Sequence, residues 1–160
     1  MTQTKEETGM ANRQVLNDLL SETFNSILRI EERSLDRGLT AGLTISEVHT
    51  IEAVGLHECK PMKAIAARLN ITLATLTSAI SKLERKGFVE RKANEADRRQ
   101  VLIQLTTKGR EAFKAHESFH AKLVEEALAT LSREEEFVFL KALTSVKDFF
   151  DREDRRLQSQ

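Results

Sequence analysis

The chain has 160 residues, of which 40% are hydrophobic and 31% are charged. This is enough apolar material for one compact domain, or for a small module joined to a dimerisation layer, and it excludes a disordered chain. No apolar run approaches the ~20 residues of a membrane span, and residues 1–10 lack the apolar core of a signal peptide. A single cysteine, Cys59, excludes an internal disulfide. We therefore expect a cytoplasmic protein without a membrane partner.

The net charge of zero hides an uneven distribution of charges along the chain. The segment from Lys60 to Arg110 contains 12 Lys and Arg residues but only 4 Asp and Glu residues. The rest of the chain contains 13 Lys and Arg residues and 21 Asp and Glu residues. A basic middle between acidic flanks is typical of a module that contacts phosphates. The alternative is ordinary variation among solvated helices.

The first half of the chain is predicted to be helical. Residues 1–10 are expected to form a flexible N-terminal tail. Apolar residues spaced by three and four predict an amphipathic helix over 11–33. These residues are Leu16, Leu20, Phe24, Ile27 and Ile30. A second helix is predicted to begin at Thr44 or Ser46 and to end near Gly55.

Two short helices separated by a tight turn are predicted next. Pro61 suits the first turn of a helix over 62–69. Thr72 can cap a following helix over 73–86, and Gly87 is suited to the left-handed residue that ends it.

A hairpin and two long helices complete the predicted elements. Strands over 88–91 and 101–105 flank the polar segment 92–99. Helices are then predicted over 106–129 and 134–152. The expected fold class is mainly α with a small β hairpin.

The order of short helix, turn, helix and hairpin is that of a winged helix-turn-helix. We therefore expect a DNA-binding module over 58–105, held by a helical dimerisation region over 11–57 and 106–155. We expect no enzyme activity, since the chain has no Gly-rich phosphate loop and no Ser–His–Asp order.

The predicted helix over 73–86 has an apolar face for the module's core, formed by Leu73, Leu76, Ile80 and Leu83. Its other face carries small and hydroxyl side chains near the N-terminus, which can approach base edges in a major groove. Cations lie further along this face and can contact phosphates. The candidate DNA contacts are Thr72, Ala74, Thr75, Thr77, Ser78 and Lys82. The alternative is a surface helix with a solvated polar face.

The predicted hairpin tip carries two adjacent arginines. Arg98 and Arg99 can enter a minor groove, where the potential is most negative. Asp97 can support this wing by hydrogen bonding to a neighbouring arginine. The alternative is a charged tip that only keeps the hairpin soluble.

Segments 71–89 and 97–106 resemble the recognition helix and wing of the MarR family of transcriptional regulators. The resemblance covers nearly the whole chain. It implies a homodimer in which the first and last two helices form the dimer layer and two wings straddle a pseudo-palindromic operator. The family often has an arginine where this chain has Ser78, which affects the expected operator sequence.

Several short motifs are similar to those of the MarR-type repressors of fatty-acid synthesis. They are Phe24-Asn25, Ile30-Glu31-Glu32, residues 47–51 and 83–87, Phe119-His120 and Val124-Glu125-Glu126. This resemblance implies double-stranded DNA as partner and an acyl group on acyl carrier protein, or another hydrophobic effector, as corepressor. The candidate effector pocket comprises Phe24, Ile27, His49, Ile51, Phe113 and Phe119. The alternative is that these residues only form a core.

Three histidines suggest a second kind of effector. His116 and His120 are four residues apart on one helix, a spacing that can hold a transition metal. With His49, their positions resemble the ligands of the zinc-sensing MarR branch, and Glu32 and Asp36 are the candidate carboxylate donors. No cofactor is otherwise required, so zinc is the alternative to an acyl effector. A hydrogen-bonded polar cluster is the simpler interpretation.

Overall fold

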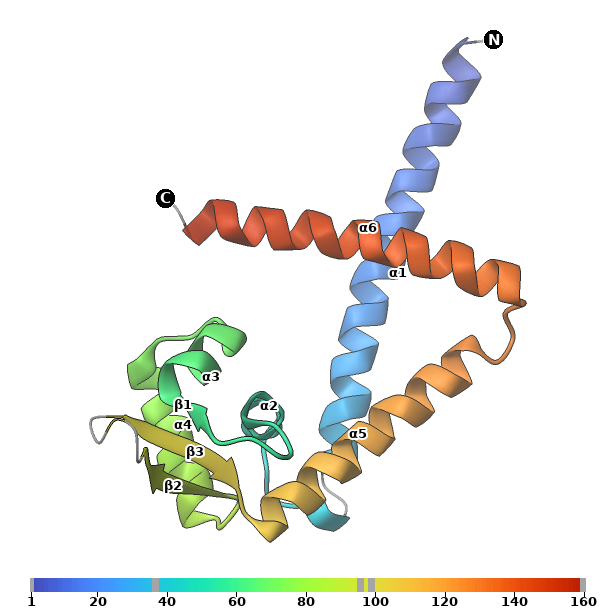
Figure 1. The fold of residues 1–160 in the computed structure, drawn as a ribbon. Coiled ribbons are helices and arrows are strands. Elements are labelled where there is room, and N and C mark those ends of the chain that lie inside the picture. Colours follow the sequence, from blue (N-terminus) through green and yellow to red (C-terminus); the bar gives the residue numbers. More distant parts are fainter. Residues whose placement is uncertain (1, 36–37, 95–96, 98–99, 159–160) are drawn as a thin grey trace. The chain divides into compact units, whose positions relative to one another are not determined.

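The computed structural model describes residues 2–35, 38–94, 97 and 100–158, with the backbone alone for residues 2–11, 39 and 158. Within it the chain forms two units, Met1–Phe119 and His120–Gln160, each of which is described by itself. Figure 1 shows the elements of both units.

The first unit contains the winged helix-turn-helix, together with the first helices of the chain and the start of α5 (Figure 1). Its elements are α1 (Thr2–Leu35), a 3-10 turn (Gly38–Thr40), α2 (Ile45–Val54), β1 (Lys60–Pro61), α3 (Met62–Leu69), α4 (Leu73–Arg85), β2 (Val89–Ala93) and β3 (Val101–Leu105). Helix α5 (Thr107–Leu128) runs into the second unit, which also contains α6 (Arg133–Gln158).

The predicted fold class is confirmed, and local signals explain the helix boundaries. The Thr44 side chain accepts the N–H of Glu47 at the start of α2, and the Thr72 side chain accepts the N–H of Thr75 at the start of α4. Asn70, with φ of 53°, ends α3 in the left-handed conformation. Helices α3 and α4 make an angle of 106°, within the range of a helix-turn-helix.

The sheet has the strand order β1–β3–β2, and both pairings are antiparallel. The pair β2–β3 runs from Val89 opposite Leu105 to Ala93 opposite Val101. The two-residue strand β1 pairs Lys60 with Ile103 and was not expected from the sequence. It joins the start of the helix-turn-helix to the wing.

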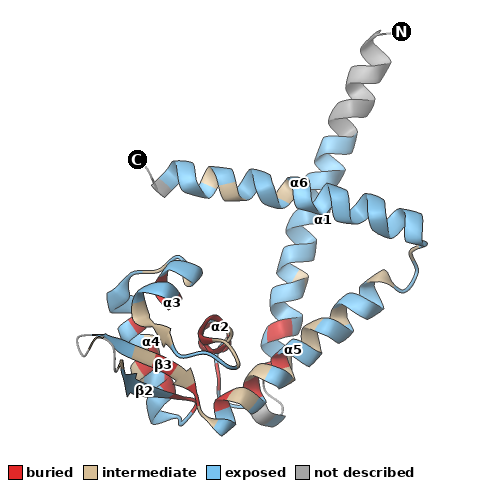
Figure 2. Cartoon of the chain, viewed as in Figure 1, coloured by how far each residue is buried: buried red, intermediate tan, exposed pale blue. Residues whose placement is uncertain are grey.

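The core of the first unit lies among α2, α3, α4 and the sheet, where Figure 2 shows most of the buried positions. Ile51, Ile65, Leu76, Ile80 and Ile103 are fully buried there. Burying such side chains contributes about 1.5–3 kcal/mol each, so this core holds α4 against the rest of the module.

Four sequence-based expectations differ from the structure. Helix α1 begins at Thr2, so residues 2–10 are helical rather than a tail, which fits the helix propensity of Lys5, Glu6 and Glu7. Helix α6 extends to Gln158, and β2 begins at Val89 and ends at Ala93. Leu73 is 43% exposed, because it lies in the first turn of α4, beyond the core.

Among the described residues, no single helix has the length and hydropathy needed to cross a membrane. Only the bent pair α3 and α4, counted together, reaches those values.

Candidate nucleic-acid interface

Helix α4 has one face in the core and the opposite face in solvent. Leu76, Ile80 and Leu83 are fully buried and lock this helix onto the module. All six candidate contacts on or before the helix are exposed: Thr72, Ala74, Thr75, Thr77, Ser78 and Lys82. The sequence pattern had predicted this division of faces for every residue named except Leu73, which is exposed.

Hydroxyl groups gather at the N-terminal end of α4. The Oγ1 atoms of Thr72 and Thr75 lie 2.9 Å apart. Thr77 donates its hydroxyl to the carbonyl of Leu73 at 2.7 Å, and Ser78 donates to that of Ala74 at 3.3 Å. Because each hydroxyl proton is used within the helix, the oxygen lone pairs of Thr77 and Ser78 remain for external donors. Amino groups of adenine and cytosine are such donors in a major groove.

A side chain of the wing contacts the exposed part of α4. Arg91 on β2 donates to Ser81 Oγ at 2.9 Å and lies 3.5 Å from a carboxylate oxygen of Glu84, both on α4. The predicted wing contacts Arg98 and Arg99 lie outside the described residues. Asp97 is half-buried, and its carbonyl accepts the N–H of Gln100 at 2.9 Å.

The six candidate effector residues have different environments. Ile51 is fully buried in the core, and Phe113 packs against that core. Phe24 and Ile27 are 49% and 36% exposed on α1. Phe119 borders a pocket of about 130 Å³, below the roughly 300–1,000 Å³ of most small-molecule sites. The effector pocket therefore stays a prediction.

A polar cluster links α1, α2 and α5 within the first unit. The buried Glu31 places Oε1 3.0 Å from His49 Nε2 and 3.2 Å from His116 Nε2. A carboxylate oxygen of Glu52 lies 3.6 Å from His116 Nε2. The two imidazole rings are 6.1 Å apart. At these distances both rings can donate a hydrogen bond to Glu31.

The carboxylate that His49 and His116 share is Glu31, which differs from the sequence-based expectation. The exposed Glu32 is not among the acidic partners found for His49 and His116, and Asp36 lies outside the described residues. His120 is half-buried on α5, where the second unit begins. The spacing could have identified Glu31, because it lies four residues after Ile27 on the apolar stripe.

Comparisons with known proteins agree with this architecture. The model of the MarR family matches residues 43–101, which span α2 to the start of β3. The helix-turn-helix regulator YhjH of Bacillus subtilis is 31% identical over 124 residues, covering 75% of this chain and 71% of that protein. The chain belongs to the MarR family. It is a DNA-binding transcriptional regulator of the winged helix-turn-helix type.

Solved MarR structures extend the likeness beyond the matched segment. FabT of Streptococcus pneumoniae, solved in complex with DNA, has 36% identity and a TM-score of 0.83, covering 88% of this chain and 98% of its own. MepR of Staphylococcus aureus, also solved with DNA, has 22% identity and a TM-score of 0.68, covering 82% and 94%. The likeness to MepR supports the fold alone.

Proposed function

We propose that this MarR regulator is a homodimeric repressor that binds a pseudo-palindromic operator through α4 and the wing of each copy. The observation that carries this proposal is the exposed N-terminal half of α4, with small and hydroxyl side chains on a helix whose other face is locked in the core. Two such helices one helical turn of DNA apart would contact two half-sites.

The proposed contacts divide into two kinds. Thr72, Ala74, Thr75, Thr77 and Ser78 lie where base edges would be met and would determine sequence preference. Lys82 lies further along α4 and would meet a phosphate.

At the wing, Arg98 and Arg99 would enter the minor groove with support from Asp97. We expect Arg99→Ala to weaken binding to every sequence and to reduce the slope of log K against log salt by about two, one for each copy in the dimer. An unchanged affinity across salt concentrations would remove the wing from the interface.

Exposed apolar side chains on the long helices support a homodimer. In the first unit, α1 exposes Val15, Leu16, Leu19, Leu20, Phe24, Ile27, Leu28 and Ile30. In the second unit, α6 exposes Phe137, Val138, Phe139, Leu140, Leu143, Phe149, Phe150 and Leu157. Surfaces this apolar are usually covered by a partner, and a second copy is the partner that the MarR family implies.

The effector proposed first is an acyl group on acyl carrier protein, acting as corepressor. It is supported by the likeness to the repressors of fatty-acid synthesis and to FabT over most of the chain. Binding would shift the population of dimers toward the spacing of α4 helices that fits the operator.

Zinc is the second candidate effector, and the cluster around Glu31 favours it. Zinc ligands at 2.0–2.2 Å from a tetrahedral ion lie about 3.3 Å apart. The two Nε2 atoms of His49 and His116 lie at nearly this separation from Glu31 Oε1. His49, Glu52 and His116 also offer ligand atoms within 4.8 Å of one another. His120 would be a further ligand by the family resemblance. Bound zinc would hold α2 to α5.

The test is DNA binding by fluorescence anisotropy to a duplex selected by the wild-type protein from random sequences. Long-chain acyl carrier protein and zinc are added separately to chelator-treated protein. Tighter binding with acyl carrier protein alone would support a lipid-responsive repressor. Tighter binding with zinc alone, lost in His116→Ala, would replace it with a zinc-responsive repressor. Failure to select any sequence would overturn the proposed function.

A further inference from the structure

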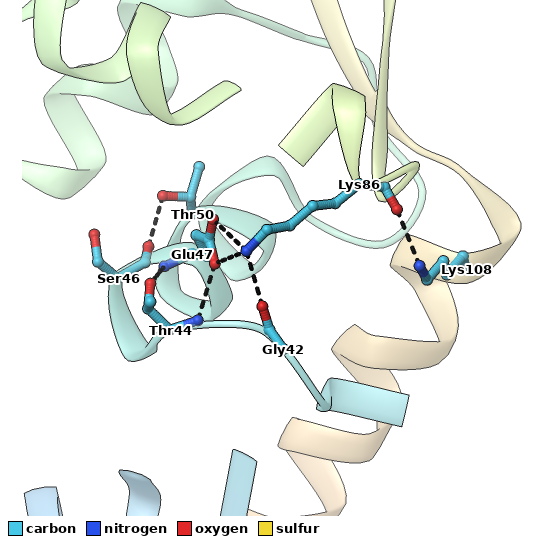
Figure 3. Close-up of polar contacts among 7 residues, drawn as sticks. All are labelled: Gly42, Thr44, Ser46, Glu47, Thr50, Lys86 and Lys108. Atoms are coloured by element: carbon cyan, nitrogen blue, oxygen red, sulfur yellow. Dashed lines mark hydrogen bonds and ion pairs between the residues drawn. The ribbon is translucent and has the colours of Figure 1, made fainter. Parts of the chain in front are cut away.

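Lys86, which follows the last residue of α4, extends its side chain to the start of α2 (Figure 3). Its Nζ atom donates to both carboxylate oxygens of Glu47, at 2.8 and 2.7 Å, and to the carbonyl of Gly42 at 2.8 Å. A lysine ammonium has three donors. The Glu47 carboxylate and the Gly42 carbonyl therefore hold this ammonium group against the start of α2.

Glu47 is itself held in place before it meets Lys86. Its carboxylate accepts the N–H of Thr44 at 2.9 Å, and its own N–H donates to the Thr44 hydroxyl at 3.2 Å. The Glu47 side chain is only 9% exposed. Burial raises the pKa of this carboxyl, but the hydrogen bonds from Lys86 and Thr44 and the charge of Lys86 lower it below its ordinary value. The Glu47 carboxylate is therefore charged at neutral pH.

The same end of α4 is also fixed to the beginning of α5. Lys108 Nζ donates to the carbonyl of Lys86 at 3.0 Å, and the Thr106 hydroxyl donates to the carbonyl of Gly87 at 2.6 Å. The junction thus connects three helices: α4, whose exposed face we assign to DNA; α2, beside the polar cluster; and α5, which leads into the second unit.

We propose that the Lys86–Glu47 pair is a positioning contact for DNA recognition, which sets the direction of α4 without touching DNA. This inference rests on the proposed role of α4 in operator binding. The base contacts proposed for α4 begin near Thr72, 14 residues before Lys86 and about 20 Å away at 1.5 Å per residue. A small rotation at the anchored end therefore moves the other end by more than hydrogen bonds to bases tolerate.

The test compares Lys86→Met with Lys82→Met, a cation on the same helix that we assign to a phosphate. Affinity is measured for the selected operator and for a scrambled duplex of equal length, over a range of salt concentrations. We expect Lys86→Met to bind the operator about tenfold more weakly, from the loss of a charged hydrogen-bonded pair. We expect its affinity for the scrambled duplex and its salt slope to be unchanged. Lys82→Met should weaken binding to both duplexes and reduce the slope by about two, one for each copy in the dimer.

A double-mutant cycle gives an independent readout. Glu47→Gln keeps the side-chain shape and every cation, so it tests the contact even where Lys86→Met fails to fold. We expect Glu47→Gln alone to weaken operator binding about tenfold, and the double variant to be no weaker than either single variant. Lys86→Arg, which keeps the charge, should restore part of the loss.

Three results would overturn the inference. One is a folded Lys86→Met or Glu47→Gln variant that has a lower melting temperature but an unchanged affinity for the operator. The pair would then contribute to stability alone. Another is a salt slope that falls by about two in Lys86→Met, one for each copy in the dimer, which would make Lys86 a phosphate contact. The third is additive loss in the double variant. Absence of operator binding by the wild-type protein is a different failure, because it would refute the proposed function itself.

Discussion

Gly109, in the first turn of α5, lies against Phe88 and Leu105 of the DNA-binding module. We expect Gly109→Ala to destabilise the protein. A Cβ atom at this position would lie 2.0 Å from the carbonyl oxygen of Phe88 and 3.2 Å from the Cβ of Leu105. Ordinary contacts of this kind begin at 3.4 Å. The same Phe88 oxygen accepts the N–H of Thr106 at 3.1 Å. Helix and strand would therefore have to separate, and this hydrogen bond would lengthen or break.

Three terms determine the size of the effect. Overpacking costs about 1–3 kcal/mol, and the backbone hydrogen bond contributes about 1 kcal/mol. Alanine is better than glycine in a helix by up to about 1 kcal/mol. The net loss in the free energy of unfolding is about 2 kcal/mol, or roughly 4–8 °C in melting temperature for a chain of this length.

The assay is thermal unfolding followed by circular dichroism, because the chain has no tryptophan or tyrosine to report by fluorescence. All variants are compared at one protein concentration, since dimer dissociation shifts the melting temperature. Glu111, exposed on the same helix, supplies the control pair. Glu111→Ala should be more stable than Glu111→Gly by about 1 kcal/mol, the reverse of the order at Gly109. A Gly109→Ala protein at least as stable as the wild type would refute the reasoning.

Three further predictions concern α4, the dimer and pH. Thr75→Ala should change the operator sequence that is selected, because its hydroxyl is exposed at the N-terminus of α4, and an unchanged motif would argue against direct base contact. Leu140→Glu should weaken the dimer by roughly 3–6 kcal/mol, since two leucines are lost per interface. The control Lys141→Gln should leave the dimer unchanged, and sedimentation equilibrium measures both. Hydrogen bonds from the Ser132 backbone and side chain lower the pKa of Glu135 below its ordinary 4.5, so their stabilisation is present above pH 4.5 and is lost as pH falls through the lowered value. Ser132→Ala should therefore be less stable than the wild type at pH 7, with a gap that narrows in acid but does not close, because the bond from the Glu135 N–H to the Ser132 hydroxyl does not titrate. A gap independent of pH would contradict the assignment.

Local chemistry explains why the helix-turn-helix could be predicted closely. The boundaries of α3 agree with the expected range, and α4 begins at Leu73 as expected. Each boundary there depends on a residue within a few positions, such as the cap at Thr72 or the left-handed Asn70. The N-terminal end of α1 lacks such a signal, and its predicted start at residue 11 was wrong.

The candidate site was predictable only in part. The exposed face of α4 follows from helical periodicity, which identifies Leu76, Ile80 and Leu83 as buried. Periodicity places Leu73 on the same face, but it does not indicate where the core ends. Leu73 lies beyond that edge and is exposed. The roles of the DNA and effector residues stay predictions, and they depend on the experiments above.

Caps, periodicity and turn residues act over a few positions, so the sequence was enough to predict the fold class, the family and the order of the helices and of the two wing strands. The contacts between distant groups became known only from the packed structure. Strand β1 exists because Lys60 pairs with Ile103, and the carboxylate that His49 and His116 share is Glu31. Lys86 meets Glu47, 39 residues away, and Gly109 is required by the carbonyl of Phe88. Each of these contacts depends on how whole helices and strands pack, and no local pattern in the chain encodes that.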